Sequence, residues 1–114
     1  MTESKRKVLI FEFEQWLDDN TGAWGKEAKC IPGRRFSFDY VIWDFGNKTH
    51  VDIAVEINGG QWVKGRHNRG GKGYESDLTK SNLAQINGFV YLQYTYEMMA
   101  RGEHFDQIGE VFNK

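Results

Sequence analysis

The sequence predicts an α+β or α/β domain with a central mixed β-sheet flanked by helices. Three features predict it: a helical apolar stripe over residues 4–19, alternation of apolar and polar residues at 35–43 and again at 50–58, and a second helix and strand at 74–87 and 89–94. With a short strand at 27–31 and one or two short helices over 95–114, the expected order is α-β-β-β-α-β-α. This order is typical of a sheet covered by helices.

The boundaries of these elements follow from local signals. Residues 20–25 are turn formers that should end the first helix, and Gly88 ends the second helix as a C-cap residue would. The first helix should bury one apolar face, which consists of Leu9, Ile10, Phe13, Trp16 and Leu17.

Length and composition indicate one domain spanning residues 1–114. The chain is 39% hydrophobic, which is enough for a core. It has no apolar run of about 18 residues and no apolar stretch after the polar N-terminus, so we expect neither a membrane span nor a signal peptide, and we expect a cytoplasmic protein. Cys30 is the only cysteine, which excludes an internal disulfide and, with three scattered histidines, argues against a zinc site. We expect no organic cofactor.

The two alternating segments predict an antiparallel hairpin with one buried face. That face carries Phe36, Phe38, Tyr40 and Ile42 in the first segment and Val51, Ile53, Val55 and Ile57 in the second. Because side chains alternate along a strand, Asp39 and Glu56 then project together from the other face. Two carboxylates with a backbone carbonyl supply the oxygen ligands that Mg²⁺ prefers, and such an ion activates water and polarises phosphate. The alternative is a pair of solvated acids.

Residues 59–73 predict a basic, glycine-rich loop. The formal net charge of −1 excludes a protein that holds nucleic acid by bulk charge alone, yet residues 59–74 contain four Lys or Arg, one His and no acid. Glycines let backbone N–H groups approach a ligand, and basic side chains contact phosphates. The candidate DNA-binding residues are Trp62, Lys64, Arg66, His67, Arg69 and Lys72. The alternative is a solvated loop with Trp62 in the core.

Three further charged residues are candidates for the catalytic site. Lys80, on the helix after the loop, is a candidate cation for the scissile phosphate or the attacking water, and the alternative is a surface ion pair with Asp77. Glu12 and Glu14 flank the apolar stripe of the first helix, and either can reach a metal ion directly or through water. The alternative is an ordinary glutamate at the helix edge, and the spacing does not choose between the two residues.

Over residues 35–98 the order and spacing of these motifs resemble the PD-(D/E)XK nuclease superfamily. The motifs are Asp39, the runs VEINGGQW at 55–62, GRH at 65–67, GYESDLTKSN at 73–82 and NGFVYLQY at 87–94. The sequence most resembles small phage and prophage endonucleases of that group, which are similar in turn to very-short-patch repair endonucleases. For a phage-encoded protein, the expected location is the cytoplasm of the host cell.

The resemblance implies a restriction-endonuclease-like αβββαβ core and Mg²⁺-dependent hydrolysis of DNA phosphodiester bonds, with Mn²⁺ as a substitute. It implies that Asp39 is the first acid and Glu56 the second, with the carbonyl of Ile57 as a further metal ligand, and that Glu12 or Glu14 is the additional acid. The pattern has a lysine two residues after the second acid, where this chain has Asn58. Some relatives place that lysine on the following helix, so Lys80 is the expected replacement.

Lys64 or Lys72 is the second choice for that lysine. The sequence thus favours a DNA endonuclease, with structure-specific cleavage of junctions or flaps in phage recombination or DNA processing as one role. A homodimer suits cleavage of two antiparallel strands. The alternative, which Asn58 favours, is an inactive nuclease fold that binds DNA or a protein partner.

Overall fold

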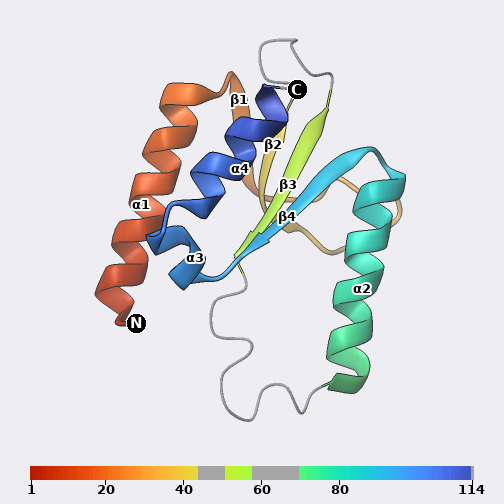
Figure 1. The fold of residues 1–114 in the computed structure, drawn as a ribbon. Coiled ribbons are helices and arrows are strands. Elements are labelled where there is room, and N and C mark those ends of the chain that lie inside the picture. Colours follow the sequence, from red (N-terminus) through yellow and green to blue (C-terminus); the bar gives the residue numbers. More distant parts are fainter. Residues whose placement is uncertain (44–50, 58–69, 114) are drawn as a thin grey trace.

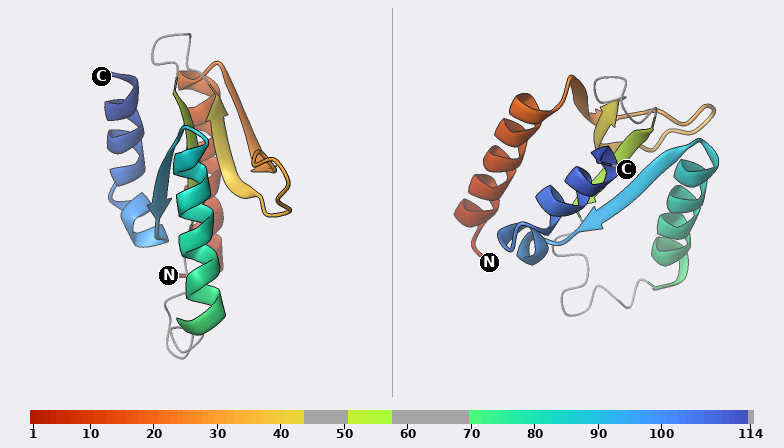
Figure 2. Two further views of the ribbon diagram at one scale, coloured as in Figure 1. Left: turned by 90° about the vertical axis from the view of Figure 1, so that its right-hand side faces the viewer. Right: turned by 45° about the horizontal axis from the view of Figure 1, so that its top comes forward.

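The computed structural model describes residues 1–43, 51–57 and 70–113, with side chains from residue 75 onward in the last range. Its centre is a four-stranded mixed sheet with helices on both faces (Figure 1). Helices α1 (Glu3–Asn20), α3 (Tyr96–Ala100) and α4 (Glu103–Phe112) cover one face, and α2 (Gly70–Ile86) covers the other (Figure 2). The expected α+β class and the order of its elements are therefore confirmed.

The strands lie in the order β1-β2-β3-β4. β1 (Ala23–Ala28) pairs antiparallel with β2 (Phe38–Trp43), which pairs antiparallel with β3 (Asp52–Ile57). β4 (Phe89–Tyr94) lies parallel to β3. A parallel pair needs a long crossover connection, and α2 is the helix of that crossover. Between β3 and β4 the chain passes through α2, and α2 therefore lies against one face of these strands.

α1 forms as its apolar spacing predicts. Its N-cap is Thr2, whose side chain accepts a hydrogen bond from the backbone N–H of Lys5 at 3.2 Å. The positions that recur every four residues, Leu9, Phe13 and Leu17, are buried against the sheet. Within the described residues, no helix is long and apolar enough to cross a membrane.

The boundaries expected for the first strand were wrong. β1 begins at Ala23, inside the segment expected to be a turn, and ends at Ala28, where the strand was expected to be starting. Pairing with β2 decides this, because Ala23 lies opposite Trp43 and Ala28 opposite Phe38. Gly25 fits this position because a Cβ there would lie 3.0 Å from the Trp43 ring. Turn formers are tolerated in β1 because it is an edge strand.

The expectation of one buried sheet face was also wrong. Tyr40, Ile42, Ile53 and Val55 pack beneath α1, α3 and α4, as the alternation predicts. The opposite face, however, buries Phe38, Val41 and Ala54, together with Ala84 of α2. The small side chains of Ala54 and Ala84 allow the helix to approach the sheet closely. The polar residues that alternate along these strands suggested a solvated face. That face nevertheless forms a second core, because it also carries the apolar residues Val41 and Ala54.

His104 is a buried ionisable side chain in the first core. It is 1% exposed and stacks on Phe105, with ring centroids 3.8 Å apart, and its Nδ1 has no hydrogen-bond partner among the described residues. Burial lowers the pKa of His104 from 6.5 to about 4, because the imidazolium cannot be solvated there. The unfolded chain consequently binds a proton in this interval that the folded chain does not.

We therefore predict that the free energy of unfolding falls as pH decreases from 6.5 towards 4, the interval between the unfolded and folded pKa values. His104→Phe should reduce that loss by roughly 2–3 kcal/mol. Urea unfolding of both proteins across this pH range measures the difference, because the other titrating groups are the same in each. An equal pH dependence in the two proteins would show that His104 is not the group responsible.

Candidate metal-binding and catalytic site

Asp39 and Glu56 join β2 and β3 through reciprocal hydrogen bonds. The backbone pairing of these strands runs from Ile42–Ile53 to Tyr40–Val55. At the next position, Oε2 of Glu56 accepts from the backbone N–H of Asp39 at 2.8 Å, and Oδ2 of Asp39 accepts from the backbone N–H of Ile57 at 2.7 Å. Each carboxylate thus accepts a hydrogen bond from a backbone N–H that a backbone carbonyl would accept in a regular β-ladder. The two acids are held side by side where the strands end.

The sheet is distorted at Asp39. Phe38 packs on the α2 face and Tyr40 on the α1 face, although residues two apart share a face in a regular strand. In β1, Lys26 pairs with Tyr40 and Ala28 with Phe38, which places Glu27 opposite Asp39. Glu27 has a φ of 51°, a left-handed conformation that non-glycine residues rarely adopt. Two adjacent strands therefore leave regular geometry at the first acid, and such distortions cluster at functional sites.

Lys80 of α2 reaches this acid pair. Its ammonium group forms an ion pair with Oε1 of Glu56, and the side chains of Lys80 and Glu56 are 17% and 10% exposed. The ammonium also lies 5.6 Å from the Phe36 ring centroid and 5.3 Å from that of Phe38. Aromatic faces attract a cation and exclude water from it. Lys80 is thus held at Glu56, instead of pairing with Asp77 at the surface.

The electrostatics of Glu56 reflect two opposing influences. Burial raises the pKa of its carboxyl group, and the neighbouring Asp39 raises it further. The ammonium of Lys80 and the N–H of Asp39 lower the pKa, but only in part. Burial, Glu56, Asp77 and Asp39 likewise raise the pKa of Tyr91, which lies beneath α2. Burial is thus the main influence on both groups, and the neighbouring carboxylates act in the same direction.

Glu14 is anchored near the acid pair, whereas Glu12 is not. Oε2 of Glu14 accepts a hydrogen bond from the Tyr40 hydroxyl at 2.6 Å and another from Lys26 Nζ at 3.1 Å. Burial and the Glu14 carboxylate raise the pKa of Tyr40, so the phenol remains a donor. Glu12 is exposed and forms no hydrogen bond or ion pair with described residues. Of the two first-helix glutamates, the structure places Glu14 beside β2.

Asp39, but not Glu56, borders a hollow of about 350 Å³ that Tyr40, Ile57 and Lys26 also line. The donor set fits a hard divalent cation, because it combines two carboxylates with the adjacent Ile57 backbone. Among the described residues Asp39 accepts a hydrogen bond only through Oδ2, from Ile57, so within this part of the chain Oδ1 is open to a ligand. No group of three His, Cys, Asp or Glu side chains gathers among the described residues. Asp39 and Glu56 would hold such an ion together with backbone oxygen and water.

The residues expected to contact DNA lie outside the described residues. These are Trp62, Lys64, Arg66, His67 and Arg69, with Asn58 at the motif position. Lys72 belongs to the first turn of α2, but its side chain lies outside the description as well. The expected loop therefore stays a prediction over 59–69, and α2 begins at Gly70, within the segment expected to be loop.

Two features of the site did not follow from the sequence. The hydroxyl of Tyr40 holds Glu14, although alternation assigned Tyr40 only to the core. Phe36 and Phe38 line the position of the Lys80 ammonium, although both were assigned to the face of Tyr40. The sequence did contain a signal for the first feature, because Tyr40 follows Asp39 and a side chain that only fills a core does not need a hydroxyl group. The second depended on the distortion at Asp39, which the sequence pattern does not reveal.

No family model, curated protein or solved structure gives a significant match to the chain.

The ion pair of Lys80 with Glu56 makes a prediction for stability. Lys80→Met should destabilise the protein by about 1–3 kcal/mol, because it leaves the Glu56 carboxylate buried beside Asp39 without a cation. The pKa of Glu56 is already raised in the folded state and should rise further, so the folded chain holds the proton longer. The destabilisation should therefore be larger at about pH 8 than at about pH 5.

Urea unfolding in EDTA at the two pH values measures this difference. The matched control is the double variant Lys80→Met with Glu56→Gln, which removes both charges and should recover most of the loss at the higher pH. A cost of Lys80→Met that is independent of pH and unaffected by Glu56→Gln would contradict the assigned pairing.

Proposed function

We propose that this chain is a Mg²⁺-dependent DNA endonuclease. The observation that carries the proposal is the acid pair: two carboxylates, Asp39 and Glu56, held side by side at the end of two strands with Lys80 against them. Paired carboxylates with a neighbouring cation suit phosphodiester hydrolysis, where negative charge develops on phosphate. An arrangement formed by residues of three separate elements is hard to explain as a solvated surface pair, because Glu56 is buried and Asp39 is half-buried.

In this proposal, Asp39, Glu56 and the Ile57 carbonyl hold Mg²⁺, or Mn²⁺ in its place. Bound there, the ion would polarise a phosphoryl oxygen and lower the pKa of a water molecule. Lys80 would orient the scissile phosphate and balance its charge, the role of the lysine that Asn58 replaces in the motif. Glu14, held by Tyr40 and Lys26, would keep a second carboxylate beside β2.

The fold supports the same proposal. The order α1-β1-β2-β3-α2-β4 and the mixed sheet are those that the resemblance to PD-(D/E)XK nucleases implies. We propose a restriction-endonuclease-like core on this basis, with branched or flapped DNA of phage recombination or processing as the substrate class. A homodimer would place two such sites on two antiparallel strands.

The test of the proposal is metal-dependent cleavage. Purified protein should cut supercoiled plasmid, linear duplex or a four-way junction in Mg²⁺ or Mn²⁺, but not in EDTA. Glu56→Gln and Lys80→Ala should each slow cleavage by about 10²–10³-fold while leaving most DNA binding. The matched control is Asp19→Asn, which removes an exposed carboxylate at the end of α1. Full-rate cutting by Glu56→Gln would show that this carboxylate is not part of the active site.

A second candidate is a nuclease fold that binds DNA or a protein partner without cutting. One observation favours it: both oxygens of Glu56 already have donors, Lys80 and the Asp39 N–H. An ammonium group that satisfies the carboxylate competes with a metal ion for it. A gel shift of DNA that persists in EDTA, with no cleavage under either metal ion, would support this function over the first.

A further inference from the structure

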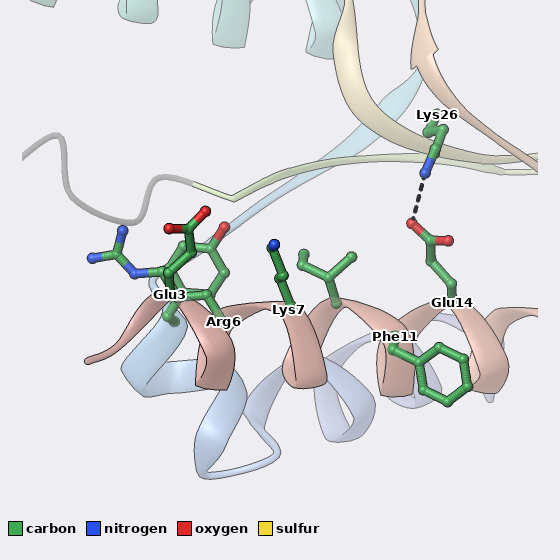
Figure 3. Close-up of a pocket in the computed structure, with 8 residues that line it drawn as sticks. Glu3, Arg6, Lys7, Phe11, Glu14 and Lys26 are labelled. Atoms are coloured by element: carbon green, nitrogen blue, oxygen red, sulfur yellow. Dashed lines mark hydrogen bonds and ion pairs between the residues drawn. The ribbon is translucent and has the colours of Figure 1, made fainter.

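A groove lies beside α1 and continues into the hollow at Asp39. We call it the α1 groove; it has a volume of about 530 Å³ and three basic side chains in its lining, Arg6, Lys7 and Lys26 (Figure 3). It shares Ile10, Lys26 and Tyr96 with the hollow that Asp39 and Ile57 line. The two cavities are therefore contiguous, and a ligand that reaches Asp39 can extend along α1.

Arg6 and Lys7 are free to bind an anion. The Arg6 guanidinium lies 5.1 Å from the centroid of the Tyr96 ring, and its Nε is buried without a hydrogen-bond partner among the described residues. Figure 3 shows the Lys7 ammonium directed toward the strands, and Lys7 forms no ion pair within the described part of the chain. Neither cation is paired with a described carboxylate, so both can contact an anion in the groove.

The carboxylates of the groove do not cancel this charge. Glu14 already accepts hydrogen bonds from Lys26 and Tyr40, so these groups satisfy one another. Glu3 is the other acid of the lining, and it forms no ion pair with Arg6 or Lys7. The open end of the α1 groove is thus basic, and the end next to the candidate site is acidic.

This polarity fits a strand of nucleic acid with one phosphate at the acid pair. Lys7 and Glu14 are seven residues apart on α1, which corresponds to about 10 Å along the helix axis. Successive nucleotides of one DNA strand rise about 3.4 Å, so this length spans roughly three nucleotides. The ring of Tyr96 adds aromatic surface for sugars or bases.

We propose that the α1 groove binds the DNA strand on one side of the scissile phosphate, with Arg6 and Lys7 contacting phosphates about three nucleotides away. This inference rests on the proposed nuclease function and adds to it a substrate path that leads along the first helix. The basic residues of this path belong to α1, whereas the sequence assigned the basic contacts to the 59–73 segment.

The test compares two lysines of the same helix. Lys7→Gln removes a charge from the α1 groove, whereas Lys5→Gln removes one from a position about 200° around the helix. Both residues are exposed, so neither change should disturb folding, which thermal unfolding verifies. Binding of a fluorescein-labelled duplex to the full chain is measured by anisotropy in Ca²⁺ over a series of salt concentrations.

Lys7→Gln should weaken binding by about two- to fivefold at low salt. It should also reduce the slope of log K against log salt by about one, because one phosphate contact is lost. Lys7→Arg should restore both quantities, and Arg6→Gln should reproduce the loss. Lys5→Gln should leave the slope at the wild-type value.

The possible failures are distinguishable. If the wild-type protein cuts DNA but Lys7→Gln and Lys5→Gln lower binding equally, the two lysines contribute only to the overall electrostatic field of the protein. The α1 groove is then not a binding site for the DNA strand. If the slope for Lys7→Gln equals that of the wild type, the groove proposal is likewise overturned while the nuclease stands. If the wild-type protein neither binds nor cuts DNA, both proposals fail together.

Discussion

The exchange of hydrogen bonds between Asp39 and Glu56 is the constraint on which the site depends. Each carboxylate accepts a backbone N–H of the other strand, so neither acid can move without breaking the junction of β2 and β3. The same bonds bring two negative charges together, which repel each other in a partly buried place. The local structure is therefore kept by hydrogen bonds and opposed by charge, a balance that a bound cation would shift toward stability.

The two faces of the sheet supply different parts of this site. From the α2 face comes Lys80, whose ammonium neutralises Glu56. From the α1 face comes Glu14, whose carboxylate is turned toward β2 by the Tyr40 hydroxyl. Such convergence requires helices on both sides of the sheet, and it requires the parallel crossover that returns the chain through α2. A hairpin whose other face was solvated would have left Glu56 without Lys80.

The apolar environment of Lys80 links packing to chemistry. Phe36 and Phe38 lie near its ammonium because β2 is twisted at Asp39, so that Phe38 faces α2 while Tyr40 faces α1. Low exposure strengthens the attraction between Lys80 and Glu56, because water no longer screens it. The distortion at Asp39, the strained backbone of Glu27 opposite it and the acid pair are thus parts of one local arrangement.

Local patterns in the sequence are enough to predict the class of fold, the order of its elements and the closeness of Asp39 to Glu56. Apolar spacing in α1 and alternation in β2 and β3 are local properties of the chain, and they are visible without knowing what packs on each face. Such patterns do not predict where β1 begins, that Val41 and Ala54 are buried, or which first-helix glutamate lies beside β2. These outcomes depend on contacts between segments far apart in the sequence: β1 is set by pairing with β2, the second core by α2, and Glu14 by Tyr40. A periodic pattern indicates which residues of one helix or strand share a face. The burial of a charge on that face depends on which other element covers it.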